Sequence, residues 1–222
     1  MIAIFKKMKY KFKSTYNFVA CLGGIKMFYR IMRWIVYPFI HIFMRVEHHG
    51  MENIPKGKGY ILAANHVSIA DMFAIAVPVK CQICYMGKEE LFKIPVVKWL
   101  FKALGCFAVR RGKGDTEAID KACEIVNSGK VLGIFPEGTR SKTGELGKAK
   151  AGVALIAMQT KADVLPVSIK YSTGRFKLFC KVTVRVGKLI PYKEPAEDES
   201  QRASIRRISG EIMDSIKALH EM

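Results

Sequence analysis

Acidic residues are absent from the first 46 positions of the chain, and Glu47 is the first one. Lysine and arginine recur through the same stretch, and the 222 residues together carry a formal net charge of +18. A charge of this size indicates an anionic partner, such as a nucleic acid, a membrane surface, or an acidic protein or ligand. Because half of the residues are hydrophobic, global disorder is excluded and a domain with a real core is expected.

The six cysteines do not form the pattern of a disulfide framework, and no secretory cleavage signal is found. Cys81 and Cys84 make a single C-x-x-C without a second pair or a nearby set of histidines, which argues against a metal or redox site. We therefore expect a reducing compartment and no metal, and nothing in the sequence suggests an organic cofactor.

Signatures of several other function classes are missing as well. The chain has no G-x-S-x-G elbow for a nucleophilic serine. The glycine- and lysine-rich stretch 142–150 does not match a nucleotide P-loop, because Lys148 is followed by Ala149. No helix-turn-helix, zinc-finger or RNA-binding signature accompanies the basic residues, so we expect no nucleic-acid partner.

Long uninterrupted hydrophobic runs are also missing. Residues 27–44 are strongly apolar, but Arg30, Arg33, Pro38 and His41 interrupt them, and the uninterrupted part is well short of the ~20 residues that a spanning helix needs. We expect two helices that lie in a membrane interface, with basic residues at anionic headgroups. The alternatives are a basic, solvated helix packed on the domain and a short, tilted transmembrane helix.

Beyond residue 59, short apolar runs alternate with helical patterns, which predicts an α/β layered fold. Pro166 is expected at an edge or at the start of its strand, because proline cannot donate to a sheet ladder. The pattern predicts strands over residues 60–64, 82–86, 105–109, 130–135, 164–169 and 176–186, and helices over residues 68–78, 95–104, 115–127, 151–160 and 202–222.

A histidine and an aspartate stand five positions apart, directly after the first of these strands. Ser68 and Asp71 have the spacing of a helix N-cap and its third helical residue, which puts His66 in the preceding loop. The Asp71 carboxylate then reaches back to one nitrogen of His66 and leaves the other nitrogen as a base. The alternative is that Asp71 only caps the helix and His66 is a loop histidine.

Two loops at strand ends carry further charged residues. The stretch 110–114 places two arginines and a lysine among glycines, a composition suited to a phosphate, although a solvated basic loop is the commoner case. The stretch 136–141 presents Glu137, Thr139 and Arg140 after another strand, where ligands of α/β sheets usually bind.

These residues resemble the glycerolipid acyltransferase family, typified by bacterial 1-acyl-glycerol-3-phosphate acyltransferase. Asn65-His66 and Asp71 match its N-H-x-x-x-x-D motif, the HX4D motif. Three further blocks follow in the right order, over residues 88–111, 135–141 and 164–169. The N-terminal basic and aromatic segment is similar to the two-helix membrane motif of bacterial members.

The resemblance implies a layered, mixed central β-sheet flanked by helices, with residues 1–48 as the membrane-associating segment and 49–222 as the acyltransferase domain. It implies His66 as the base and Asp71 as its partner. The same resemblance gives a substrate-binding set of Asn65, Lys88, Arg111, Glu137, Gly138, Thr139 and Arg140.

The implied reaction moves a fatty acyl group from coenzyme A or acyl carrier protein to the sn-2 hydroxyl of lysophosphatidate, which yields phosphatidic acid for phospholipid biosynthesis. The implied location is the cytoplasmic face of the cell membrane, as a peripheral or monotopic protein on an anionic bilayer. Two alternatives stay open: the same chemistry on another lysophospholipid or an acyl-amino-acid lipid, and a non-enzymatic basic membrane-binding protein.

Overall fold

The computed structural model describes residues 43–57, 59–79, 81–95, 98, 101, 105–109 and 116–222. The membrane-associating helices expected before residue 43 lie outside this range, as does most of the helix expected at 95–104. Within the described part, none of the helices is both long and apolar enough to cross a bilayer.

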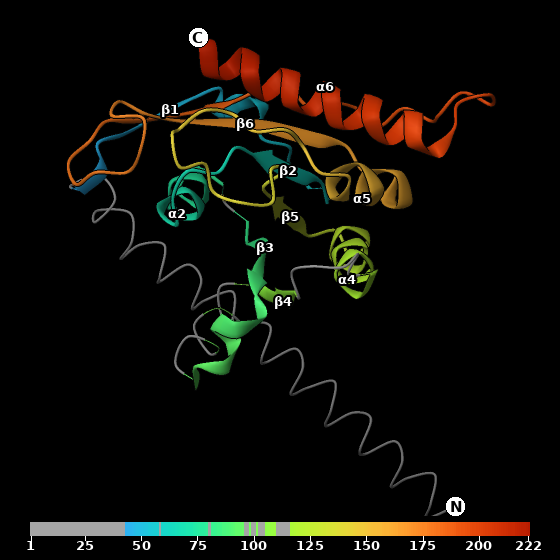
Figure 1. Ribbon diagram of the computed structural model, residues 1–222, viewed down its shortest axis with the longest axis horizontal. Coiled ribbons are helices and arrows are strands. Elements are labelled where there is room, and N and C mark those ends of the chain that lie inside the picture. Colours follow the sequence, from blue (N-terminus) through green and yellow to red (C-terminus); the bar gives the residue numbers. More distant parts are fainter. Residues whose placement is uncertain are drawn as a thin grey trace, which may run out of the picture.

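A seven-stranded sheet forms the centre of the fold, in the order β1-β7-β6-β2-β5-β3-β4 (Figure 1). Its strands occupy most of the runs that the sequence pattern predicts. They are β1 (Val46–His49), β2 (Ile61–Ala64), β3 (Ile83–Lys88), β4 (Phe107–Val109), β5 (Val131–Ile134), β6 (Val164–Tyr171) and β7 (Val182–Val186).

The strand directions bring the carboxyl ends of several strands to one edge of the sheet. Five strands are mutually parallel through the pairs β2·β5, β2·β6, β3·β5 and β3·β4, whereas β7 is antiparallel to β6 and β1 is parallel to β7. The carboxyl ends of β2, β3, β5 and β6 therefore share an edge, and the chain enters β1 at that same edge. Residues 46–49 form β1 at the edge of this sheet.

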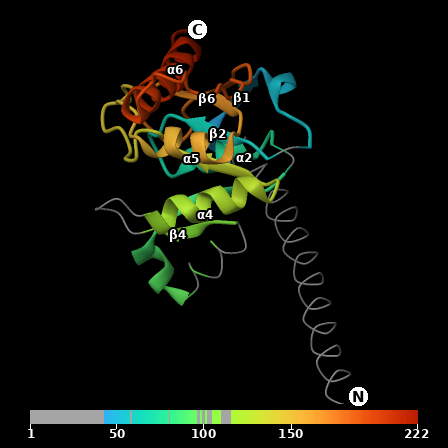
Figure 2. The same cartoon turned by 90° about the vertical axis from the view of Figure 1, so that its right-hand side faces the viewer.

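Helices cover both faces of the sheet, which confirms the expected layered α/β architecture (Figures 1 and 2). The short helix α2 packs on one face, where Ile75 joins a core with Leu62 and Ala64. On the other face, Ile212 and Ile216 of the C-terminal helix pack with Ile61 of β2. The helices are α2 (Ala70–Ala76), α4 (Thr116–Asn127), α5 (Gly152–Thr160) and α6 (Gln201–Glu221), with two 3-10 turns, η1 (Met51–Asn53) and η2 (Glu89–Lys93).

Pro166 lies inside β6, in the middle of the sheet, and not at an edge or a strand start as expected. Its neighbours explain the difference. Residues on either side of it bond to β2, whereas Pro166 faces the β7 side, where its carbonyl accepts from Gly187 at 2.9 Å. Because β7 ends at Val186 and the chain bulges before Ile190 rejoins Val164, no partner there needs the missing N–H.

The long strand expected over residues 176–186 is also wrong, because only Val182–Val186 pairs with β6. Residues 172–181 form a turn-rich connection between β6 and β7, in which Phe179 adopts a positive φ of 62°. A left-handed residue interrupts an extended strand, so the ladder begins only after it.

Candidate active site

The carboxyl-end edge of the sheet gathers the His66 loop after β2, residues 135–141 after β5, and Tyr171 at the end of β6. Ser141 ties two of these loops together, since its N–H donates to the His66 carbonyl at 2.7 Å. Segments that lie about 70 and 100 residues apart in the sequence thus meet at one place, as expected for loops that follow parallel strands.

The predicted contact between His66 and Asp71 is present. Nδ1 of His66 lies 2.9 Å from Oδ2 of Asp71, and the Asp71 side chain is completely buried. The same Oδ2 accepts from the backbone N–H groups of Val67 at 2.7 Å and Ser68 at 2.8 Å. These bonds hold the carboxylate in one orientation, so Nδ1 of the imidazole is engaged and Nε2 is the nitrogen left for a substrate.

The local helix start differs by one residue from the expected one. Asp71 is the second residue of α2, which begins at Ala70 after Ile69. Ser68 still contributes, because its Oγ accepts from the Ala70 N–H at 3.2 Å, while Asp71 bonds back to the Ser68 N–H. The reciprocal pattern of a capping box is therefore kept with a shifted register, and it delivers the carboxylate to His66.

Tyr171 is a site residue that the sequence patterns missed. Its hydroxyl donates to Oδ1 of Asp71 at 2.5 Å, and burial together with this carboxylate raises the pKa of Tyr171 above its usual range. The period-two alternation of β6 places Leu165, Val167 and Ile169 on the face that α2 covers, and Tyr171 continues that face. The predicted strand stops at residue 169, and extending its alternating pattern by two residues would have identified Tyr171.

Phe135 defines the other side of the histidine. Its ring stacks on the His66 ring with centroids 3.8 Å apart and an angle of 11° between the planes. The His66 side chain remains only 13% exposed. The imidazole is thus fixed by stacking on one face and by Asp71 at one nitrogen, which limits it to a single rotamer.

Asn65 occupies a structural position next to the base. Its Nδ2 donates to the Ile169 carbonyl at 2.9 Å, and its Oδ1 accepts from the Ile169 N–H at 2.7 Å. The side chain therefore continues the β2·β6 ladder by one step beyond Ala64, and the residue is only 1% exposed. These bonds position the start of the His66 loop, and the substrate contact that the resemblance implies for Asn65 stays a prediction.

Glu137 is only 6% exposed, and its Oε1 has no hydrogen-bond partner among the described residues. Burial raises the pKa of Glu137, whereas backbone N–H groups of His66 and Gly147 oppose that rise. A buried carboxylate oxygen without a donor is costly unless a bound hydroxyl or cation completes it. Gly138, with a φ of 69°, makes the tight turn that follows.

The remaining predicted binding residues do not all lie on the loop that carries Glu137. Thr139 and Arg140 are exposed on the same loop as Glu137. Lys88 ends β3 at the surface and pairs with Glu90 at 3.2 Å. Arg111 lies outside the described residues.

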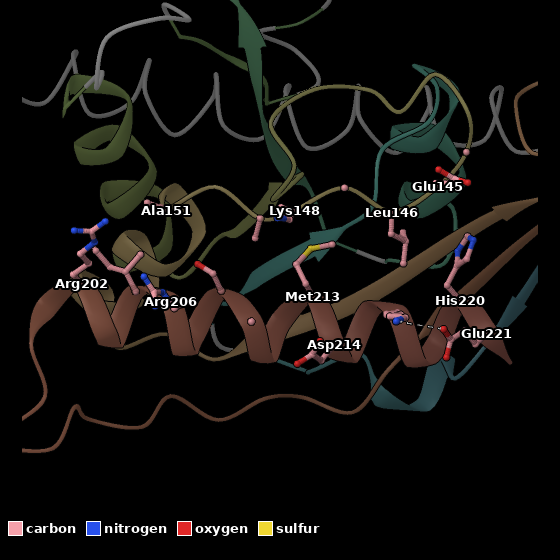
Figure 3. Close-up of a pocket in the computed structure, with 17 residues that line it drawn as sticks. Glu145, Leu146, Lys148, Ala151, Arg202, Arg206, Met213, Asp214, His220 and Glu221 are labelled. Carbon is pink, nitrogen blue, oxygen red and sulfur yellow. Dashed lines mark ion pairs between the residues drawn. The ribbon is translucent and has the colours of Figure 1, made fainter.

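A groove of about 990 Å³ lies between loop 144–151 and α6 (Figure 3). Leu146 and Lys148 of the loop face Arg206 and Met213 of α6 across it. His66 and Asp71 do not line this groove. Within the described residues, no group of three or more His, Cys, Asp or Glu side chains is arranged to hold a metal.

The known proteins to which this chain is similar include several that are named as acyltransferases. A 1-acyl-sn-glycerol-3-phosphate acyltransferase from Borreliella burgdorferi is 33% identical over 129 residues, which are 57% of this chain and 51% of the relative. A lyso-ornithine lipid O-acyltransferase from Pseudomonas aeruginosa is 31% identical over 109 residues, which are 49% of this chain and 42% of that protein.

The solved structure of the 1-acyl-sn-glycerophosphate acyltransferase PlsC from Thermotoga maritima shares the fold. It matches with a TM-score of 0.62 and 29% identity, over 89% of this chain and 80% of that one. The chain spans between 38% and 51% of the length of the first curated relatives that it matches. The model of the acyltransferase family covers residues 45–170, which is more than half of the chain, and the chain therefore belongs to the acyltransferase family.

Proposed function

We propose that this protein transfers a fatty acyl group from a thioester to the sn-2 hydroxyl of lysophosphatidate and so forms phosphatidic acid. The observation that carries the proposal is the 2.9 Å contact between a fully buried Asp71 and Nδ1 of His66. A carboxylate in this place fixes the tautomer of the ring and stabilises the imidazolium that forms on proton transfer.

The proposed reaction needs no acyl-enzyme. Nε2 of His66 takes the proton of the acceptor hydroxyl while that oxygen attacks the thioester carbonyl. The tetrahedral intermediate then collapses, the carbon–sulfur bond breaks, and the departing thiolate takes the proton from the imidazolium. General-base assistance of this type contributes ~10²–10⁴-fold to the rate.

Residues 137–140 are proposed to hold the glycerol-phosphate end of the acceptor. The buried Oε1 of Glu137, which has no partner among the described residues, is suited to position an arginine that holds the phosphate. The exposed Arg140 guanidinium and Thr139 hydroxyl are suited to phosphate oxygens, and Arg111 would add a second guanidinium. Lys88, which pairs with Glu90 at the surface, stays a proposed binding residue.

The acyl donor is proposed to be a thioester of coenzyme A or of acyl carrier protein, with no further cofactor. The net charge of +18 suits both an acidic carrier and an anionic bilayer. We place the protein as a peripheral or monotopic protein on the cytoplasmic face of the cell membrane, since acceptor and product both partition into lipid.

A second acceptor class has specific support. The relative from Pseudomonas aeruginosa is named for acylating a lyso-ornithine lipid, and it is similar to about half of this chain. The same His66 chemistry then acts on a hydroxyl whose carrier is an amino-acid lipid, and the Arg140 loop meets a different headgroup.

The test is transfer of a labelled acyl group from coenzyme A and carrier-protein thioesters to a panel of acceptors. The panel contains lysophosphatidate, other lysophospholipids and lyso-ornithine lipid. We expect lysophosphatidate to be preferred and His66→Ala to lower its rate by about 10²–10⁴-fold. The matched control is His49→Ala, since His49 is an exposed histidine on β1.

Each outcome is informative. Preference for the amino-acid lipid selects the second acceptor class. Equal rates of His66→Ala and the control, with both proteins folded, contradict the proposed mechanism. Membrane binding without transfer to any acceptor by the unaltered protein leaves the non-enzymatic alternative.

A further inference from the structure

Exposed apolar side chains gather at the carboxyl-end edge of the sheet. Of the seven large hydrophobic residues that are exposed in the described part of the chain, only Met222 does not follow the carboxyl end of β2, β3 or β6. Because these strands are parallel, the other six lie at the edge that carries His66. The six are Ile69, Leu91, Ile94, Phe176, Leu178 and Phe179.

Half of this set lies in one loop, residues 172–181 between β6 and β7. Phe176, Leu178 and Phe179 are 41%, 58% and 52% exposed. Basic residues alternate with them, namely Arg175 and Lys177. Large apolar side chains exposed next to one another mark an interaction surface, and a mixture of aromatic, aliphatic and basic residues fits the boundary between headgroups and acyl chains.

The loop is attached to the catalytic pair. The Phe176 ring packs edge-on against Tyr171, with centroids 6.2 Å apart, and Tyr171 bonds to Asp71. On its other side the loop is braced by loop 141–147, where a Cβ on Gly144 would lie 2.0 Å from the Gly174 carbonyl oxygen.

The loop is also attached to the start of the described chain. The N–H of Phe179 donates to the Phe43 carbonyl at 2.7 Å, and the two rings lie 5.7 Å apart. The loop therefore sits between the point where the basic N-terminal sequence joins the fold and the point where the base is held. Figure 1 shows the connection from β6 to β7 on the same side of the sheet as α2.

We propose that loop 172–181 inserts into the surface of an anionic lipid bilayer, with Phe176, Leu178 and Phe179 at the acyl boundary and Arg175 and Lys177 at the headgroups. It is a second lipid contact besides the N-terminal segment. Its role is to fix how far His66 lies from the membrane surface. The hydroxyl of a lysolipid then reaches the base while the acyl chain of that lipid stays in the membrane. Only this role rests on the proposed function, and the insertion itself does not.

The first test places a tryptophan in the loop and needs no turnover. Leu178→Trp is introduced into a background in which Trp34 and Trp99, the two native tryptophans, are replaced by phenylalanine. The probe is a vesicle of phosphatidylcholine and phosphatidylglycerol with brominated acyl chains. We expect a blue shift and strong quenching of the introduced fluorophore. The control is Asn127→Trp, at an exposed position at the end of α4 and next to the amino end of β5.

The second test measures affinity for the same vesicles without bromine. Leu178→Ser is expected to weaken binding by on the order of tenfold, since the burial of one leucine side chain in lipid is lost. Lys177→Glu is expected to weaken binding by a similar, salt-sensitive factor. Lys130→Glu, a charge reversal at the amino end of β5, is the control and is expected to have at most a small effect.

Acyl-transfer assays distinguish a failure of the insertion from a failure of the proposed function. Leu178→Ser is expected to lower acyl transfer to vesicle-borne acceptor and to leave transfer to a short-chain, monomeric acceptor unchanged. Quenching at position 178 without transfer to any acceptor keeps the insertion and overturns the proposed function. Transfer without quenching and with unaltered vesicle affinity overturns the insertion. So does a loss confined to carrier-protein thioesters, or a change only in self-association, because those results assign the loop to a protein partner.

Discussion

Tyr171→Phe is the substitution that best tests how the catalytic pair is held. It removes one hydroxyl and keeps the ring, so the packing of Phe176 against position 171 is preserved. In the native protein this hydroxyl donates to Oδ1 of a carboxylate that is completely buried. Because the pKa of Tyr171 is raised by burial and by Asp71, the hydroxyl stays protonated and donates throughout the assay range.

The expected magnitude follows from the number of bonds that remain. Loss of a hydrogen bond to a buried charged group costs about 1.5–3 kcal/mol of unfolding free energy. The three bonds to Oδ2 of Asp71, from His66, Val67 and Ser68, are untouched, so the orientation of the ring survives. We therefore expect only about a tenfold loss of kcat for Tyr171→Phe, against about 10³–10⁴-fold for Asp71→Asn, which places an amide against His66.

The assay pairs urea unfolding with acyl transfer to the preferred acceptor. Tyr192→Phe is the matched control, because the Tyr192 hydroxyl bonds at 3.2 Å to an exposed Glu194 and lies away from the site. It is expected to change stability by less than about 0.5 kcal/mol and to leave kcat unchanged. Two results refute the reasoning: unchanged stability and rate in Tyr171→Phe, or a rate loss as large as that of Asp71→Asn in a folded protein.

Three further changes test the frame around the site. Asn65→Ala removes both side-chain bonds to Ile169 and is expected to lower the free energy of unfolding by about 2–4 kcal/mol and to slow kcat, as measured by urea titration and acyl transfer. Gly144→Ala is expected to destabilise by about 1–3 kcal/mol, because its φ is 91° and the new Cβ would meet a backbone oxygen; an unchanged melting curve would contradict this. Burial and neighbouring cations lower the pKa of His220, so its contribution is present above about pH 6.5 and is lost as the pH falls through the lowered value; His220→Gln should flatten the pH dependence of stability there, and an identical acid limb would count against it.

The apolar edge of the sheet gives the fold a consistent orientation. Chain entry at β1, the His66 loop and loop 172–181 all lie at the same edge. A protein that meets lipid at this edge presents its base to the bilayer and leaves α6 on a face of the sheet (Figure 2). Only the headgroup and hydroxyl of the acceptor then need to leave the bilayer surface to reach the base, so its acyl chain is not moved into water.

The sequence by itself determined the local part of this protein. Apolar runs predicted the positions of most strands, and the spacing of Ser68 and Asp71 predicted that a carboxylate would reach His66, because a helix start is decided within a few residues. The charged loop at 136–141 was predicted to be presented at a strand end, because it directly follows an apolar run that forms β5.

Only the tertiary structure decided which distant groups meet there. The bond of Tyr171 to Asp71 spans 100 positions, and the use of Asn65 as a step of the β2·β6 ladder spans 104, so neither leaves a local pattern. Pro166 is tolerated inside a central strand because β7 has already ended beside it. The strand expected over 176–186 begins only at Val182, since Phe179 has a positive φ and its N–H bonds to the Phe43 carbonyl. These outcomes depend on strand order and register, which are fixed by packing between segments and not by the residues of any one of them.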